Sequence, residues 1–445
     1  MNGIMALAAA LLILAANAGS AIAADTLAIS LEESVRIALE RNKDLIVARE
    51  KTSEARALVG ETETAFLPQI TGSAGYTRLD VAPFIPTSRF GMLGGGLLPK
   101  EIVIGLRDNY AATLRLQQPL FTGGRITKTR DIARLAGNEA ESDVQRAARE
   151  LVYEVKRAYL SCVKAANTER VAAESVNRFE AHLADIQTLR DAGLAADNDV
   201  LKTKVYLSES RLALMRALHA VRLARTYFCN VVDLPLASEI LFTSSIEAAA
   251  PIGIDLETAV GTGLRKREEL QSMEYRNRMT RKEFEMARGG YLPDVSFFAN
   301  LNYLYPNREY ERDFYSSWSM GVLAQMNLFD WGRTAYRIRQ SRSRLRQIET
   351  AERSLRDAIT LDVTETYFSL IEAWNEIEAA RENVAQAEEN HRVTAARFKE
   401  GLATNTEMLD AQVLLTGART IRESAAADYL IARADLARAV GADIP

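Results

Sequence analysis

The sequence is poor in proline, cysteine and histidine, and each scarcity excludes a class of protein. Ten prolines in 445 residues leave long stretches without a helix breaker, which predicts a few long elements rather than many short ones. Two cysteines, Cys162 and Cys229, exclude a disulfide-rich scaffold. A disulfide between them stays open, but two separately buried thiols are favoured, because neighbouring helix axes usually lie farther apart than a disulfide permits. His182, His219 and His391 lack metal-ligand spacing, so no metal site is predicted.

Basic net charge, phosphate loops and long apolar runs are also missing. A formal net charge of −4 argues against nucleic-acid binding. Residues Gly94 to Gly96 lack the strand, helix and lysine of a phosphate-binding loop. Serine and acidic residues are scattered as on solvated helix faces, so neither an enzyme nor a cofactor is predicted. After residue 25, no stretch approaches the roughly 20 apolar residues of a transmembrane helix. If this chain enters a membrane, it must use strands.

The first residues have the pattern of an export signal. An apolar run from Ile4 to Ala16 is followed by small residues that end in Ala21-Ile22-Ala23, which suits signal peptidase. We therefore expect residues 1–24 to be a signal peptide and the mature chain to begin at Ala24 or Asp25.

The rest of the chain contains one unit twice. Leu31 to Ile70 aligns with Leu256 to Val295 at a constant offset of 225 residues. From the phrase LFTGGR at Leu120, which matches LFDWGR at Leu328, the offset is 208. The difference is an insertion in the first copy. We predict a first repeat over 25–231, a linker over 232–255 that forms a small equatorial belt, and a second repeat over 256–445.

Each copy switches from a helical to an alternating pattern and back again. Pro68 and Pro293 end the first helical segment, because the residue before proline disfavours the α region. Apolar and polar residues then alternate over strands of about ten residues, which predicts membrane hairpins at about 68–121 and 293–329. A soluble sheet with one wet face is the alternative interpretation. The inserted segment between about Leu79 and Asn109 is expected to be a loop that faces the cell exterior.

The LF-x-x-GR phrases mark the return from strand to helix. Thr122 or Asp330 can cap the helix, and glycine accommodates the turn. The junction residues are Gly124, Arg125, Gly332 and Arg333. The helices that follow, over about 125–190 and 333–399, would each be roughly 100 Å long. The apolar spacing predicts coiled-coil seams at Val363, Tyr367, Leu370, Trp374 and Ile377, and at Leu201, Val205, Ser208, Leu212 and Met215.

Shorter helices complete each copy. Those over about 31–66 and 196–231 would each measure roughly 54 Å, so two placed end to end match one long helix. The helical hairpins extend over about 125–231 and 333–440. They turn at Gly193-Leu194 and at Gly401-Leu402, where glycine serves as the C-cap.

These paired motifs resemble the TolC-type outer-membrane factors, also called the outer membrane efflux protein family. The resemblance covers the whole mature chain and rests on the duplicated Leu-Pro junctions, the LF-x-x-GR junctions and the two hairpin tips. It implies an α+β membrane protein in which four transmembrane strands per chain contribute to a homotrimeric twelve-stranded β-barrel, above a long periplasmic coiled-coil barrel. The residues themselves also indicate an oligomer, because four strands cannot close into a barrel and lipid tolerates no open sheet edge.

The resemblance also implies a function. The chain would be the outer-membrane exit duct of a tripartite efflux pump or type I secretion system. It would be surrounded by outer-membrane lipid. It would conduct substrates passively to the exterior from a periplasmic adaptor and an inner-membrane pump or ABC transporter. The alternative is a structural coiled-coil or adhesin-like surface protein without a pore. The exported substrate and the pump class are not specified by this chain.

The same resemblance assigns site residues. The tips, Gly193 with Leu194 and Gly401 with Leu402, would contact the adaptor. Glu407 and Asp410 would form an acidic gate at the tunnel mouth, and Asp199 and Lys202 occupy the equivalent positions in copy one. Where the family has a tyrosine and an arginine, this chain has Phe398 and Ala403, which leaves open how the closed state is locked. A salt bridge between Lys202 and Asp410 is the alternative to the gate.

Arginines crowd the start of the second long helix. They are Arg333, Arg337, Arg339, Arg342, Arg344 and Arg346, and no acidic residue follows until Glu349. A solvated helix face is one interpretation. Binding to anionic lipid headgroups is the other, because this segment is expected just below the membrane.

Overall fold

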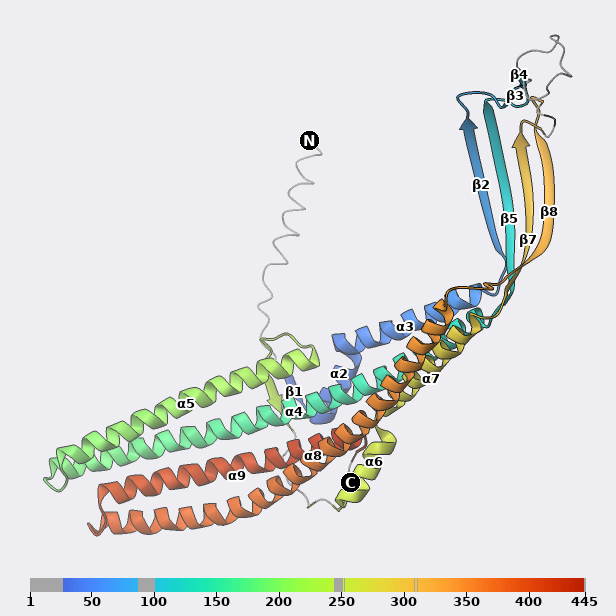
Figure 1. Cartoon of the computed structure of the whole chain (residues 1–445). Coiled ribbons are helices and arrows are strands. Elements are labelled where there is room, and N and C mark those ends of the chain that lie inside the picture. The colour runs from blue at the N-terminus through green and yellow to red at the C-terminus, as the bar shows by residue number, and fades with distance from the viewer. Residues whose placement is uncertain are drawn as a thin grey trace, which may run out of the picture. The chain divides into compact units, whose positions relative to one another are not determined.

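The computed structural model describes residues 27–86, 101–243, 251, 253–307, 309 and 311–443 (Figure 1). The expected signal peptide over 1–24 and the tip of the insertion around Gly95 lie outside these residues. The helices are α2 (Leu31–Arg41), α3 (Lys43–Thr64), α4 (Arg125–Asp191), α5 (Asp197–Val232), α6 (Leu256–Lys266), α7 (Glu268–Gly289), α8 (Arg333–Lys399) and α9 (Asn405–Val440). Among the described helices, none combines the length and the apolar composition needed to span a lipid bilayer.

The chain divides into two compact units. A strand unit contains Glu50–Ser142 and Gln271–Ser354. A helical unit contains the described residues of Met1–Arg49, Asp143–Leu270 and Leu355–Pro445. Each unit draws on both sequence repeats, so the duplicated halves are intertwined rather than arranged as separate domains.

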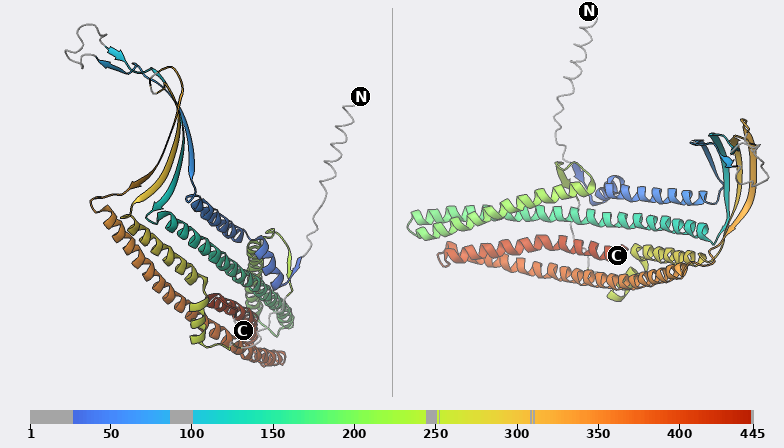
Figure 2. Two further views of the ribbon diagram at one scale, coloured as in Figure 1. Left: turned by 90° about the vertical axis from the view of Figure 1, so that its right-hand side faces the viewer. Right: turned by 45° about the horizontal axis from the view of Figure 1, so that its top comes forward.

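The strand unit contains one four-stranded antiparallel sheet. Its strands are β2 (Gln69–Arg78), β5 (Asp108–Thr122), β7 (Asp294–Tyr305) and β8 (Tyr315–Gln325), in that spatial order. The central pair, β5 with β7, joins the two repeats and sets Leu114 opposite Leu301. The views in Figures 1 and 2 show the four strands side by side.

The two faces of this sheet differ in polarity. On one face, Arg115 Nε donates to Asn300 Oδ1 at 3.0 Å, and Asn300 Nδ2 donates to Ser319 Oγ at 3.3 Å. On the other face, Leu301, Trp318 and Met320 are exposed in the single chain. The strands therefore alternate as the sequence pattern predicts, because successive side chains point to opposite faces.

The prediction of one unbroken helix over about 31–66 is wrong. The chain breaks at Asn42, between α2 and α3, and at the equivalent Arg267, between α6 and α7. Both residues leave the helical region, with ψ of 128° and 127°. Asn42 Oδ1 caps α3 by accepting from the backbone N–H groups of Asp44 at 2.9 Å and Leu45 at 3.2 Å. These side-chain contacts replace the helical hydrogen bonds that the break removes.

Two short strand pairs were not predicted. In the expected belt, β6 (Ile240–Phe242) pairs in parallel with β1 (Leu27–Ile29). In the expected exterior loop, β3 (Phe84–Pro86) pairs with β4 (Glu101–Val103). Both pairs are three residues long, which is too short for an alternating pattern to be recognised in the sequence.

Two of the buried hydrophobic clusters described in the helical unit are equivalent, one in each repeat. In the first, Tyr159 and Phe228 are fully buried, and the Tyr159 hydroxyl donates to the Ile29 carbonyl at 3.3 Å. Cys162 and Cys229 are buried free thiols in this core, as favoured from the sequence. Burial raises the pKa of Cys162 to about 12, which keeps its thiol protonated and unreactive.

Only one of the two predicted coiled-coil seams is buried within the chain. In α8, Val363, Leu370 and Ile377 lie in the second core. In α5, by contrast, the predicted seam is 44–60% exposed at its apolar positions, which are Leu201, Val205, Leu212 and Met215. The buried face of α5 instead includes Val200 and Leu207. The exposed stripe is therefore available to another molecule.

Candidate functional site

The two hairpin tips of the helical unit have the same backbone geometry. Gly193 and Gly401 adopt φ of 75° and 72°, in the left-handed region that favours glycine. The N–H of Leu194 donates to the Leu189 carbonyl at 2.8 Å, and the N–H of Leu402 donates to the Arg397 carbonyl at 2.7 Å. These bonds close Schellman motifs at both helix ends.

Each tip presents an exposed leucine. Leu194 is 76% exposed and Leu402 is 69% exposed. A Cβ atom added to Gly193 or Gly401 would meet no atom within 4 Å. Apolar side chains that extend into solvent from a rigid turn are suited to contact with a partner protein.

Glu407 has a structural role that was not predicted from the sequence. Its carboxylate accepts the backbone N–H of Thr404 at 2.6 Å and the Thr404 hydroxyl at 3.0 Å, while its own N–H donates to Thr404 Oγ1 at 3.2 Å. These hydrogen bonds cap α9 and lower the pKa of Glu407. The spacing of Thr404 and Glu407 is that of a capping box, so the sequence did contain the signal.

Asp410 lies one turn further along α9 and is exposed. Lys202 does not form the salt bridge that was considered for it. Its Nζ donates instead to the Thr406 hydroxyl at 3.4 Å. Among the described residues, no cation lies within salt-bridge distance of Asp410, so none of them pairs with its charge.

Asp199 repeats in α5 part of what Glu407 does in α9. Its carboxylate accepts the backbone N–H of Ala196 at 3.4 Å, at the start of the helix. Its backbone carbonyl also accepts from Asn405 Nδ2 at 3.2 Å, which links α5 to α9. The two acidic positions that the repeat makes equivalent therefore both stabilise helix starts behind the tips.

A buried polar cluster lies behind the tips and was not predicted. His182 of α4 is 3% exposed, and its Nε2 lies 2.8 Å from Oδ1 of Asn405, which is 6% exposed. Asn405 Nδ2 also donates to Thr203 Oγ1 at 3.4 Å, and the His182 ring contacts that of Phe398 at a centroid distance of 5.4 Å. The first of these contacts joins residues 223 positions apart, so no local pattern could reveal it.

A charged layer follows this cluster along the hairpins. Arg419 of α9 contacts Glu388 of α8 at 2.8 Å and Glu174 of α4 at 3.3 Å. Burial lowers the pKa of His182, and burial together with Arg178, Arg419 and His182 itself lowers the pKa of His391. Both imidazoles are therefore held in their neutral form.

The strand-to-helix junctions belong to the strand unit. Gly124 and Gly332 adopt φ of 82° and 80°. Thr122 Oγ1 accepts from the N–H of Ile126 at 3.3 Å, and Asp330 Oδ2 accepts from the N–H of Thr334 at 2.8 Å. Both residues act as the helix caps that the sequence predicts. Pro68 and Pro293 each directly precede a strand, and Arg125 and Arg333 each begin a long helix.

No metal centre accompanies these features in the part of the chain that the structure describes, where groups of three or more histidine, cysteine or acidic side chains with suitable geometry are absent. The arrangement consists of a two-faced sheet, long paired helices and two exposed tips. In such an arrangement, the exposed tips can contact partner proteins, and the sheet and helices can form part of the wall of a larger assembly.

Comparison with known proteins assigns this architecture to a family. A family model described as outer membrane efflux protein matches residues 35–226 and 261–442. Over 433 residues the chain is 24% identical to the outer membrane protein TolC of Vibrio cholerae, covering 93% of this chain and 90% of that protein.

Two solved structures share the fold. The CmeC outer membrane channel of Campylobacter jejuni matches with a TM-score of 0.81 at 15% identity, over 93% of this chain and 86% of that chain. A membrane protein from Pseudomonas aeruginosa matches with a TM-score of 0.80 at 21% identity, over 93% and 90% of the two chains. These likenesses confirm the TolC-like fold class. Because the family model spans most of both repeats, the chain belongs to the outer membrane efflux protein family and is an outer-membrane exit duct for efflux pumps with a periplasmic portion.

Proposed function

We propose that three copies of this chain form the duct and that substrates pass through it without chemical change. The observation that carries this proposal is the four-stranded sheet, whose outer strands β2 and β8 each have one edge that pairs with no other described strand. Unpaired backbone groups are costly in lipid, so the edges must pair with those of neighbouring copies. Two copies would enclose a space filled by side chains, so an open pore favours three.

The helical unit supports the same assembly independently. Leu201, Val205 and Leu212 expose an apolar stripe on α5, and Leu361 and Phe368 are 67% and 57% exposed on α8. In Figures 1 and 2, α5 and α8 lie on opposite outer sides of the paired hairpins. Two different apolar faces on opposite sides suit a head-to-tail interface, which closes into a ring.

The tips would be the docking points for a periplasmic adaptor. Leu194 and Leu402 are the apolar anchors, and Gly193 and Gly401 hold them in place. The adaptor would connect the duct to an inner-membrane pump or ABC transporter, and the pump would select the substrate.

Asp410, with Glu407, would narrow the periplasmic mouth. Threefold symmetry would gather six carboxylates at one level. A ring of this kind concentrates cations and repels anions. The capping bonds of Glu407 reduce its freedom to act in the ring, so Asp410 would contribute most of the effect. Asp199 and Lys202 would set the charge on the adjacent α5.

The proposal is tested with purified full-length protein. Native mass spectrometry should show trimers, and planar bilayers that contain them should show discrete conductance steps. Monomers, or trimers without conductance, would instead support the alternative of a coiled-coil or adhesin-like surface protein.

A further inference from the structure

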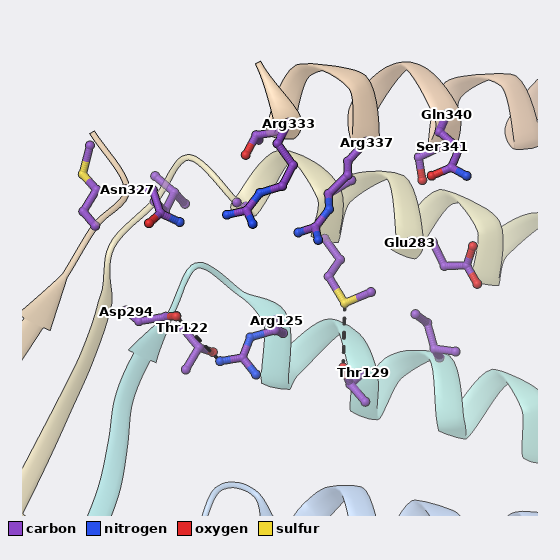
Figure 3. Close-up of a pocket in the computed structure, with 18 of the residues that line it drawn as sticks. Thr122, Arg125, Thr129, Glu283, Asp294, Asn327, Arg333, Arg337, Gln340 and Ser341 are labelled. Atoms are coloured by element: carbon purple, nitrogen blue, oxygen red, sulfur yellow. Dashed lines mark hydrogen bonds and ion pairs between the residues drawn. The ribbon is translucent and has the colours of Figure 1, made fainter. Parts of the chain in front are cut away.

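A cavity of about 770 Å³ lies in the strand unit, where strands end and long helices begin. It is bounded by the end of β5, the start of β7, the last turns of α7 and the first turns of α4 and α8. Four arginines line it, Arg125 from α4 and Arg333, Arg337 and Arg344 from α8. Figure 3 shows Arg333 and Arg337 extending from α8 into the space beside α4.

The cavity lining carries more positive than negative charge. The acidic residues in its lining are Glu283 and Asp294, and Asp294 lies 3.8 Å from Arg125. Within the described ranges, no carboxylate comes within 4 Å of the guanidinium groups of Arg333, Arg337 or Arg344. Guanidinium groups bind phosphate oxygens through paired hydrogen bonds, so this lining suits a phosphate group.

The first repeat shows that the fold does not require these arginines. At the equivalent junction, Arg337 is replaced by Thr129 and Arg344 by Ala136. The two copies share two arginines here, because Arg125 matches Arg333 and Arg134 matches Arg342. In copy one, Arg125 lies 3.8 Å from Asp294 and Arg134 contacts Glu63 at 2.6 Å, whereas Arg333 has no carboxylate within 4 Å among the described residues. Because α4 forms the same long helix without the cluster, stability alone does not explain the arginines.

Exposed apolar side chains surround the start of α8. Leu328 is 88% exposed, Phe329 73%, Trp331 87% and Tyr336 67%. Trp331 also adopts φ of 57° at the position that glycine occupies in copy one, a conformation that costs roughly 1–2 kcal/mol. Exposed aromatic rings beside cations are typical of the region where a membrane meets water.

We propose that this cavity binds the phosphate of an anionic lipid headgroup at the periplasmic surface of the outer membrane. The inference rests on the proposed function, which places the sheet in the membrane and the long helices in the periplasm. The exposed rings at Phe329 and Trp331 would lie among the acyl chains and headgroups. The guanidinium groups of Arg333, Arg337 and Arg344 would hold the phosphate.

The test compares two triple variants of the full-length protein with equal loss of charge. The first, Arg333→Gln/Arg337→Gln/Arg344→Gln, removes arginines that line the cavity. The matched control, Arg339→Gln/Arg342→Gln/Arg346→Gln, removes arginines of the same helix that lie outside the lining. Native mass spectrometry would measure binding of phosphatidylglycerol, of phosphatidylcholine and of inorganic phosphate.

We expect the cavity variant to bind phosphatidylglycerol at least about tenfold more weakly than the native protein, while the control changes less than about twofold. Equal losses in both variants would show diffuse attraction and overturn the site. Strong binding of inorganic phosphate, with no preference for the lipid, would assign the cavity to a free anion and overturn the lipid. Lost trimers with unchanged lipid binding would show that the arginines contact a neighbouring copy, which also overturns it.

Two additions keep the outcome clear. If the triple variant fails to fold, single Arg337→Gln and Arg337→Lys variants replace it, and the lysine should restore only part of the binding because it cannot form paired bonds. Conductance is recorded on the same samples. Lipid binding without conductance would refute the duct and leave the site, whereas conductance without lipid binding would refute the site alone.

Discussion

The His182 imidazole of the first hairpin and the Asn405 amide of the second meet in a buried 2.8 Å contact. Neither residue has a counterpart of the same type in the other repeat, where Asn390 and Asp197 stand instead. The contact therefore breaks the internal symmetry at the place where the two hairpins must hold together behind their tips. Removal of either partner would leave a buried polar group without its hydrogen bond.

We predict that Asn405→Ala lowers the free energy of unfolding by about 1–3 kcal/mol, because His182 loses its partner in a buried site. Chemical denaturation at pH 7.5 measures this value. Asp197→Ala is the matched control, since Asp197 is the equivalent first residue of α5 and is 84% exposed. A loss in the control as large as that in Asn405→Ala would show that the helix start, not the buried contact, is responsible.

The stability of the hairpins should fall as pH falls below the ordinary histidine pKa of about 6.5. His182 and His391 have lowered pKa values in the fold. The unfolded chain therefore binds protons that the folded chain does not, so lowering the pH stabilises the unfolded state relative to the folded state. The contribution of the two neutral histidines to stability is fully present above about pH 6.5, and it is lost as pH falls toward their lowered pKa values in the folded state.

The residues around both imidazoles are consistent with the lowered pKa values. His182 faces Asn405 of α9, Phe398 of α8 and Asp185 of its own helix, and His391 faces Arg178 and Arg419. Melting temperatures at pH 7.5 and 5.5 should differ more for the native protein than for a His182→Gln/His391→Gln variant. The exposed His219→Gln serves as control. An unchanged pH dependence in the double variant would contradict the prediction.

Arg267 should be among the most sensitive residues of the helical unit. Its side chain is 11% exposed, and it contacts Asp362 at 2.5 Å, Glu269 at 2.8 Å and the Ala439 carbonyl at 3.4 Å. Arg267→Ala leaves the Glu269 carboxylate without its ion-pair partner and leaves Asp362 paired with Arg438 alone, at 3.0 Å, and it should cost about 3 kcal/mol in unfolding free energy. The neighbouring, exposed Arg265→Ala should cost less than about 0.5 kcal/mol. Similar costs for Arg267→Ala and Arg265→Ala would show that the contacts of Arg267 at the break between α6 and α7 do not stabilise the fold.

Much of this architecture could be predicted because it follows from local patterns repeated twice. Strand alternation, the prolines at Pro68 and Pro293, and the glycines at Gly193 and Gly401 each act within a few residues. The breaks at Asn42 and Arg267 could not be predicted in this way. Asn42 Nδ2 donates to the Val231 carbonyl at 3.1 Å, and Arg267 reaches the equivalent Ala439, so both breaks depend on partners far away in the sequence.

The tip prediction concerns Gly401. Its φ of 72° is strained for any L-residue and more so for a β-branched one, so Gly401→Val should cost at least about 1–2 kcal/mol, but the space around the residue is empty and trimers should remain intact. If the proposed adaptor contact is right, export should nevertheless be lost, because Leu402 would be displaced from its proposed docking position. Gly417→Val, on the same hairpin but within α9, is the control. Loss of trimers in Gly401→Val would indicate a folding defect rather than a lost contact.

The last prediction separates the roles of Glu407 and Asp410, the two acidic residues of the proposed mouth. Because the Glu407 carboxylate is bound at 2.6 Å and 3.0 Å to Thr404, its replacement by alanine should destabilise the start of α9 by about 1 kcal/mol. The carboxylate of Asp410 has no such role and faces solvent. Asp410→Ala should therefore leave unfolding unchanged while it reduces cation selectivity and block by divalent cations, both measured in single-channel recordings.

The double variant Glu407→Ala/Asp410→Ala should reduce selectivity further, and Asp197→Ala, which removes one exposed carboxylate from the other tip, should change it little. A selectivity loss confined to Glu407→Ala would show that the capping residue itself faces the pore. If none of the three variants alters selectivity or block, the acidic ring lies elsewhere on the helices, and the assignment carried over from the family resemblance is wrong for this chain.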